Sequence, residues 1–405
     1  MNTKWIRGAT VLLMIYIIAM YGYLELFSIH LPEQFKGTAL DFSTFIAADQ
    51  LAMINEANIV MAWFEMIEIP IKCYGIFVLF TLKDAQLRGH ILEKTKWNIS
   101  KIVKYSVVYY FLASLVTVPF QLIYFFVLRN IGKTNNSLFE AVLYLGYREF
   151  MPFLKLFVLL LIILALLKWA PKRWFMYVLL IDLAYLGYLI YPEFVIERPD
   201  GEPILEAGET RTLILDYAQQ HNFPVKEIFA LEDLPEDTIN ASVYGNKHEI
   251  YIFLPEDITS VITEDELLAL LSHEFGHIYD PFDSTVSLVI IFTLQSIVTF
   301  GVLAYFVRRF QLQKQPLALQ IIPLYFVVMF IMNFIFGTFA NMSTQFYEYE
   351  ADRYAVELMN NSEPIISLIQ KTGESGAILQ LPPGLSYIYS SHPTIYDRLQ
   401  PWVNP

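Results

Sequence analysis

The stretch TEDELLALLSHEFGHIY, residues 263–279, decides how this chain folds around its chemistry. Thr263 followed by Glu266 forms a capping box, in which each side chain bonds the other residue's backbone N–H, so a helix is predicted to begin there. The leucines that follow give this helix an apolar side. His273 and His277 then stand at positions i and i+4, so both imidazoles project from the same face.

Two neutral imidazoles placed in this way are able to bind one Zn²⁺ ion. Glu274 directly follows the first histidine and is placed to act as a general base on the water that the metal activates. A catalytic zinc ion takes three protein ligands and keeps one position open for water or substrate. A third ligand is therefore expected elsewhere in the chain.

The candidate for that ligand lies in the stretch YEYEADR, residues 347–353. Glu348 and Asp352 are separated by four residues, so one helix face carries both carboxylates. Glu348 is able to ligate zinc, and Asp352 is able to accept the remaining N–H of a ligand histidine. Glu350 points elsewhere by helical spacing. The alternative interpretation of this stretch is a solvated acidic helix.

The composition indicates a membrane protein that crosses the bilayer several times. Of the 405 residues, 56% are hydrophobic and only 17% are charged, which is unusual for a soluble protein of this size. Seven spans are predicted, at about residues 8–28, 59–82, 105–128, 152–170, 173–192, 286–307 and 319–341. The net charge of −13 makes a nucleic-acid partner unexpected. Cys73 is the single cysteine, which excludes an intrachain disulfide.

Several acidic residues fall in or near these spans. Glu65 and Glu68 lie in the second span, which Pro70 is expected to kink, and Asp182 lies in the fifth. Charge within a bilayer is costly, so these side chains face a water-filled chamber or, for Glu65 and Glu68, sit at the membrane interface. Both interpretations remain open at this point.

The chain divides into four segments by polarity. Residues 1–194 hold spans one to five, 195–285 the polar segment with the HEFGH motif, 286–341 spans six and seven, and 342–405 the segment with Glu348. The first polar segment reads as a helix over Glu209 to Gln220, two short strands and the motif helix. The expected fold is a mainly α membrane protein whose seven helices enclose a chamber, with a small α+β metal-binding domain built from two segments.

The pair of motifs HEFGH and EYEAD resembles the integral-membrane zinc metalloproteases that include the CAAX prenyl protease type I enzymes and HtpX. The resemblance implies that Glu348 is the third zinc ligand. It also implies that His392 and Arg398, in a histidine-proline motif, contact the substrate or the transition state. Asn240 and Ala241 match an edge at which such proteases align the substrate backbone as an added strand.

The function implied is a membrane-embedded zinc endopeptidase that cleaves a polypeptide, unfolded or lipid-tethered, by metal-activated water. The alternative from another class is a catalytically silent scaffold or transporter in the bilayer. The chain is short for a eukaryotic member of this family and lacks a basic tail. Both features argue against CAAX processing and indicate a protein of a prokaryotic cell membrane. Lysines and arginines fall on one side of a seven-span chain, which places the zinc domain outside the cytoplasm.

Overall fold

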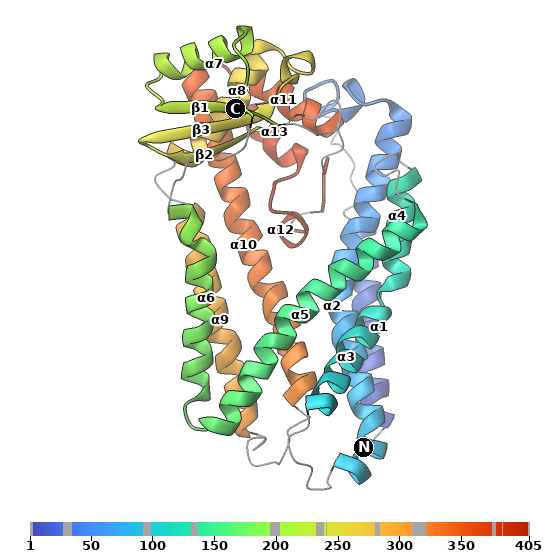
Figure 1. The fold of residues 1–405 in the computed structure, drawn as a ribbon. Helices are drawn as coiled ribbons and strands as arrows, with labels where there is room; N and C mark the ends of the chain where they lie inside the picture. The colour runs from blue at the N-terminus through green and yellow to red at the C-terminus, as the bar shows by residue number, and fades with distance from the viewer. Residues whose placement is uncertain are drawn as a thin grey trace. The chain divides into compact units, whose positions relative to one another are not determined.

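The computed structural model describes residues 3–26, 35–91, 99–130, 137–194, 203–231, 239, 241–279, 284–309, 321–374, 378–382 and 384–403. Figure 1 traces the helices and strands along the chain. The helices are α1 Thr3–Leu26, α2 Ala48–Ile91, α3 Ile99–Leu115, α4 Val118–Asn130, α5 Leu138–Trp169, α6 Trp174–Phe194, α7 Glu209–Gln220, α8 Glu264–Tyr279, α9 Ser284–Arg309, α10 Ile321–Met359, α11 Glu363–Glu374, α12 Ser386–Tyr389 and α13 Ile395–Val403. The strands are β1 Val225–Leu231, β2 Ser242–Asn246 and β3 Glu249–Pro255, and two 3₁₀ helices are η2 Phe42–Thr44 and η3 Ile258–Ser260.

The membrane-spanning character of the chain follows from its long apolar helices. Five helices of the described chain are long and apolar enough to cross a bilayer, and α3 with α4 makes a sixth span if this pair, bent by 46°, is counted as one. The remaining predicted span, 59–82, falls within α2, whose Glu65, Glu68 and Lys72 make it less apolar than the others. The expectation of a mainly α membrane protein with a small sheet is confirmed.

The chain folds into two compact units. The helical unit comprises Met1–Ser28, Ile59–Gly187 and Ile290–Phe339, and the sheet unit comprises Ile29–Asn58, Tyr188–Val289 and Ala340–Pro405. The two polar segments predicted to bind metal both fall largely within the sheet unit. The sequence did not indicate that Ile29–Asn58 joins them, although Leu40 and Phe42 of this stretch are buried in the core of the sheet unit.

Aromatic packing dominates the core of the helical unit. The ring of Tyr110 on α3 lies 5.2 Å from that of Phe153 on α5 and 5.6 Å from that of Phe326 on α10, measured between centroids. The hydroxyl of Tyr325 donates to the carbonyl of Leu156, which gives this buried phenol a partner. Large aromatic side chains from three helices therefore hold the unit together.

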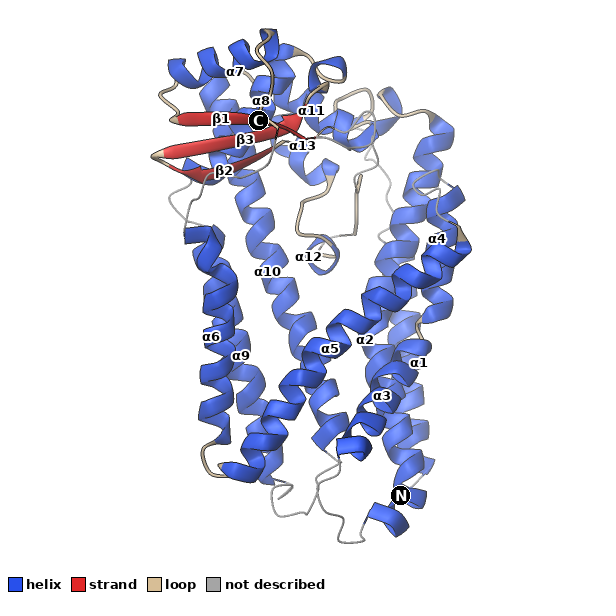
Figure 2. Cartoon of the chain, in the orientation of Figure 1, coloured by secondary structure: helices blue, strands red, loops and turns tan. Residues whose placement is uncertain are grey.

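A three-stranded sheet forms the β part of the sheet unit, with the order β1–β3–β2 (Figure 2). Strand β3 runs parallel to β1 and antiparallel to β2, so β2 is an edge strand. The glycine and asparagine at 245 and 246 suggest a turn in the sequence, but both residues belong to β2, and the turn to β3 lies at Lys247 and His248. The Asn246 side chain accepts the N–H of His248 and stabilises the turn, and Gly245 has φ of 144°, which favours glycine.

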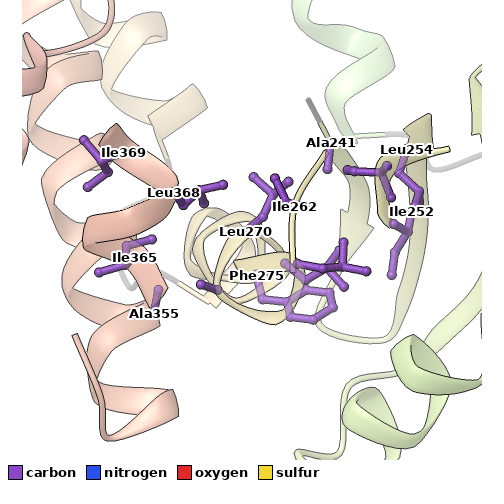
Figure 3. Close-up of a cluster of buried hydrophobic side chains, with 14 of the residues drawn as sticks. Ala241, Ile252, Leu254, Ile262, Leu270, Phe275, Ala355, Ile365, Leu368 and Ile369 are labelled. Carbon is purple, nitrogen blue, oxygen red and sulfur yellow. The ribbon is translucent and has the colours of Figure 1, made fainter. Parts of the chain in front are cut away.

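Apolar packing fixes the motif helix α8 in place. Figure 3 shows side chains of α8, Leu270 and Phe275, between those of β3 on one side and those of α11 on the other. Phe275 is fully buried, and Leu368 of α11 is 3% exposed. Each such buried side chain contributes about 1.5–3 kcal/mol relative to exposure. The helix that carries the two histidines is therefore held from both sides.

Candidate metal centre

The start of α8 is set by the predicted capping box. The N–H of Thr263 donates to the Glu266 carboxylate at 2.6 Å, and the N–H of Glu266 donates to the Thr263 hydroxyl at 3.3 Å. The helix begins at Glu264, as the sequence predicts. Two and three turns later it presents His273 and His277, whose ring centroids lie 4.9 Å apart.

A close approach of two helices brings the EYEAD segment to these histidines. A Cβ atom on Gly276 of α8 would lie 2.8 Å from the Cα atom of Ala351 on α10, closer than real contacts allow. The two small residues therefore let α8 and α10 approach closely. Gly276 is flanked by the motif histidine His277, and Ala351 by Asp352, so this contact places both motifs face to face.

The carboxylate of Glu348 lies between the imidazoles. One oxygen is 3.5 Å from Nε2 of His273, and the other is 3.7 Å from Nε2 of His277. Glu348 and His273 are both buried. Glu274 brings a further carboxylate, since one potential ligand atom from each of His273, Glu274 and His277 lies within 4.8 Å of the others. This arrangement of histidine and glutamate atoms is suited to hold a metal ion.

Asp352 fixes the orientation of the His273 ring. Its Oδ1 atom lies 2.8 Å from Nδ1 of His273, which leaves Nε2 of that ring directed toward Glu348. Arg398 in turn donates from Nε at 2.8 Å and from Nη2 at 2.6 Å to the two oxygens of Asp352. The resemblance implies substrate contact for Arg398, but in the structure its guanidinium first binds this carboxylate.

The charges around the histidines favour a bound cation. Burial and the nearby His273 together lower the pKa of His277 to about 4, so His277 is neutral and able to ligate at pH 7. Burial acts to lower the pKa of His273, but the hydrogen bond with Asp352 and the nearby carboxylate of Glu348 outweigh burial and raise it to about 9. Carboxylates that attract a proton to this extent attract a divalent cation as well.

Glu274 faces the same pocket with a perturbed acidity. Burial raises the pKa of its carboxyl to about 7, and the negative charge of Glu348 acts in the same direction. The positive charges of His273 and Arg398 and a hydrogen bond with the backbone of Val243, in the edge strand β2, oppose this shift. A carboxyl with a pKa near neutrality is suited to accept and return a proton.

These side chains line a cavity of about 440 Å³ in the sheet unit. His392 borders it, with Nε2 3.5 Å from Glu348 Oε1 and a side chain that is 66% exposed. Ala241, directly before β2, also lines it, whereas Asn240 lies outside the described residues. The structure thus brings together, around one cavity, the predicted residues His273, Glu274, His277, Glu348, His392, Arg398 and Ala241, and Asp352 binds two of them, His273 and Arg398.

An apolar wall of this cavity was not predicted from the sequence. Leu368, Ile369 and Thr372 of α11 line it together with the charged side chains. The available signal was the amphipathic pattern of residues 363–374, in which apolar side chains recur on one helix face. That pattern indicates a buried face, but it does not tell which part of the face borders a cavity.

Comparison with known proteins agrees with this arrangement. Residues 205–403 match the family model described as Peptidase family M48. The chain is 26% identical to the protein named uncharacterized metalloprotease YhfN of Bacillus subtilis, over 98% of this chain and 96% of that protein. It is 25% identical to a CAAX prenyl protease 1 homolog of Dictyostelium discoideum, over 69% of this chain and 68% of that protein.

The fold is also found in a solved structure. The crystal structure of S. mikatae Ste24p superposes with a TM-score of 0.62 and 17% sequence identity, and the match covers 98% of this chain and 97% of that one. The match thus includes the membrane helices as well as the metal centre. Since the histidine and glutamate cluster lies inside the segment 205–403 that matches peptidase family M48, the chain is an integral-membrane metalloprotease with an M48 peptidase segment.

Proposed function

We propose that the metal is zinc and that His273, His277 and Glu348 hold it. Two ligand atoms about 2.1 Å from a tetrahedral zinc ion lie about 3.4 Å apart. The distances of 3.5 and 3.7 Å from the Glu348 oxygens to the two imidazole Nε2 atoms agree with this value. This donor spacing is the observation that carries the assignment. Glu348, which is close to both rings, is preferred as ligand over Glu274.

Glu274 is then free to act as the general base. When bound, zinc would polarise the scissile carbonyl and lower the pKa of water, so that a nucleophile is available near neutral pH. Glu274 accepts a proton from the attacking water and delivers it to the leaving amine. No covalent bond between protein and substrate is required.

The remaining charged residues position this machinery. Asp352 keeps the Nδ1 proton of His273 in place, and Arg398 compensates the buried charge of Asp352. His392 borders the cavity with an exposed ring and is able to donate a hydrogen bond to the developing oxyanion. Arg398 supports the same charge from a greater distance, because its guanidinium binds Asp352.

The substrate is an extended polypeptide. Strand β2 is an edge strand whose backbone lies beside Glu274, so a peptide added to this edge would pass the base. Asn240 and Ala241, which precede this strand in the sequence, are the residues proposed to contact the substrate. Two relatives are named CAAX prenyl proteases, which supports unfolded or lipid-tethered peptides as the substrate class. The protein acts in a prokaryotic cell membrane, with the zinc site outside the cytoplasm.

The ligand assignment is tested by the zinc content of purified protein. Wild type is expected to hold one zinc ion per chain, and Glu348→Ala and the double variant His273→Ala/His277→Ala are expected to lose it. Glu350→Ala is the matched control, because Glu350 lies on the same helix but pairs with Arg353. Equal zinc in wild type and Glu348→Ala would remove Glu348 from the ligand set.

A further inference from the structure

One face of α10 contacts the C-terminal segment over three helical turns. Asn341, Gln345, Glu348 and Asp352 follow one another at spacings of four, three and four residues, which places them in a single stripe. Each side chain in the stripe contacts the stretch 386–398. The two carboxylates belong to the metal centre described above, whereas the two amides have no role in it so far.

The two amides bind the main chain of the turn that precedes His392. Nδ2 of Asn341 donates to the carbonyl of Tyr387 at 2.9 Å, and Nε2 of Gln345 donates to the carbonyl of Ser390 at 2.8 Å. Tyr387 belongs to the short helix α12, and Ser390 is its C-cap residue. The turn is therefore attached to α10 at two points, one helical turn apart.

His392 depends on this turn for its position. Its backbone N–H donates to the Ser390 hydroxyl at 3.0 Å, and its Nδ1 atom lies 3.2 Å from the Ser391 hydroxyl. The side chain is 66% exposed, so little packing restrains the ring. The place of Nε2, 3.5 Å from Glu348, is therefore set mainly by the backbone of residues 390–392.

Gln345 is an unusual residue for its location. It is fully buried, and its Oε1 atom has no hydrogen-bond partner among the described residues. A buried acceptor without a partner destabilises a fold, and an apolar side chain would avoid that cost. The amide provides the hydrogen bond from Nε2 to the carbonyl of Ser390, and an apolar side chain could not form this bond.

We propose that Asn341 and Gln345 are positioning residues of the protease, which fix the 386–391 turn and thereby hold His392 beside the metal centre. The inference rests on the proposed role of His392 in catalysis. The amides act through the turn and do not contact the substrate. The stripe on α10 thus carries a metal-binding half and a half that positions the oxyanion donor.

Kinetics of a double-mutant cycle test this coupling. Gln345→Leu keeps the volume of the side chain and removes the donor, and Gln345→Ala serves if the leucine variant folds poorly. On a peptide that wild type cleaves, His392→Ala is expected to lower kcat about 10²-fold, and Gln345→Leu about tenfold, both with little change in KM or zinc content. In the His392→Ala background, Gln345→Leu is expected to have no further effect.

Amide hydrogen exchange of residues 386–392, measured on the full chain in detergent, tests the turn without reference to activity. Exchange is expected to rise in Gln345→Leu and Asn341→Ala. Asn333→Ala is the matched control, because Asn333 also lies on α10 but accepts an exposed hydrogen bond from Gln295 of α9, so its removal leaves the turn untouched.

Unchanged exchange in the turn, or an equal loss of kcat with and without His392, would overturn the inference. If wild type cleaves no peptide or needs no metal, the proposed function fails, while the exchange measurement still decides whether the amides hold the turn.

Discussion

In the helical unit Lys72 lies 2.6 Å from Glu68 and 2.9 Å from Glu149, whereas in the sheet unit Glu348 lies 3.5 and 3.7 Å from two imidazoles. Both groups are buried and both contain carboxylates. In the first group the ammonium of Lys72 is at direct hydrogen-bonding distance from both carboxylates. In the second the partners are farther apart than the roughly 2.7–3.2 Å of an ordinary N–H···O bond.

The carboxylates in the helical unit have protein groups as their partners. Both oxygens of Glu149 accept from Lys72, and Ser114 and Gln121 each donate to one of them. The oxygens of Glu68 face Lys72 and Arg148. Of the acidic residues noted in the spans, Glu68 is thus paired by protein groups, and Asp182 accepts from Ser296. The side chain of Glu65 lies outside the described part.

The difference teaches how to distinguish a structural ion cluster from a site. Where each carboxylate oxygen has a cation or donor of its own, the charges neutralise one another and no ligand is required. Where ligand atoms from two helices converge at the spacing of a shared ion, the group is completed by an ion bound from solution. The predictions below test this distinction from the largest effect to the smallest.

The largest effect is expected for Glu274→Gln in the sheet unit. Glutamine has nearly the same shape but cannot accept the proton of the attacking water, so the cleavage rate should fall at least about 10²–10⁴-fold. Zinc content should remain at the wild-type level, because Glu274 is not assigned as a ligand. The measurements are peptide turnover and elemental analysis, with Asp265→Asn, an exposed residue of the same helix, as control. Turnover equal to wild type would contradict the assigned role.

The helical unit should respond to Lys72→Met in the opposite way. Removal of the lysine leaves two buried glutamates without their shared cation, which costs about 3–5 kcal/mol when one partner of a buried pair is deleted. The thermal unfolding temperature in detergent should fall, while zinc content and turnover per folded molecule should persist. The double variant Lys72→Met/Glu149→Gln should recover part of the stability. Full stability with lost turnover would instead mean that this cluster serves the reaction directly.

The third effect tests the contact that joins the two metal-binding helices. Gly276→Ala forces a methyl group against the backbone of Ala351, and overpacking of this kind costs about 1–3 kcal/mol. The helices should move apart, so the variant should bind zinc more weakly as well as unfold at a lower temperature. Gly337→Ala on α10 is the matched control, because a methyl group there would meet open space. Wild-type zinc affinity in Gly276→Ala would show that the close approach is not needed.

The sequence predicts those parts of the molecule that depend on local spacing. The capping box places the start of α8, and the i, i+4 spacing places His273 and His277 on one face, because both rules act within a few residues. The bond from His273 to Asp352 closes a separation of 79 residues. Only tertiary packing brings these residues together. The carboxylate spacing predicts Asp352 as partner of a ligand histidine, but it does not predict the close contact of Gly276 with Ala351 that brings the two helices together.

Other features depended on neighbours that no pattern in the chain identifies. Arg398 lines the cavity, but no pattern in the sequence identifies Asp352 as the carboxylate that its guanidinium binds. Residues Ile29–Asn58 join the sheet unit through buried apolar side chains, and apolar residues in a membrane protein do not reveal which core they enter. The amides on α10 were overlooked because their partners are backbone carbonyls.

The smallest effect is expected for Glu266→Gln at the start of α8. Burial raises the pKa of Glu266, but hydrogen bonds from Lys371, Ser367 and Thr263 outweigh it, so the pKa in the folded protein is lowered from its usual value near 4.5. A lowered pKa stabilises the fold at pH values above the unfolded-state pKa, and this stabilisation is lost as the pH falls through the lower, folded-state pKa. The free energy of unfolding of Glu266→Gln should therefore be lower than that of wild type at pH 7, by an amount typical of a lost cap, about 1 kcal/mol. The difference should shrink as the solution is acidified below about pH 4.5.

Lys371→Met is the matched variant, because it removes the cationic partner of Glu266 and leaves the carboxylate in place. A gap between wild type and Glu266→Gln that stays constant from pH 7 to pH 3 would mean that the charge of Glu266 does not stabilise this contact, and that the sheet unit, unlike the helical unit, gains nothing from its paired ions.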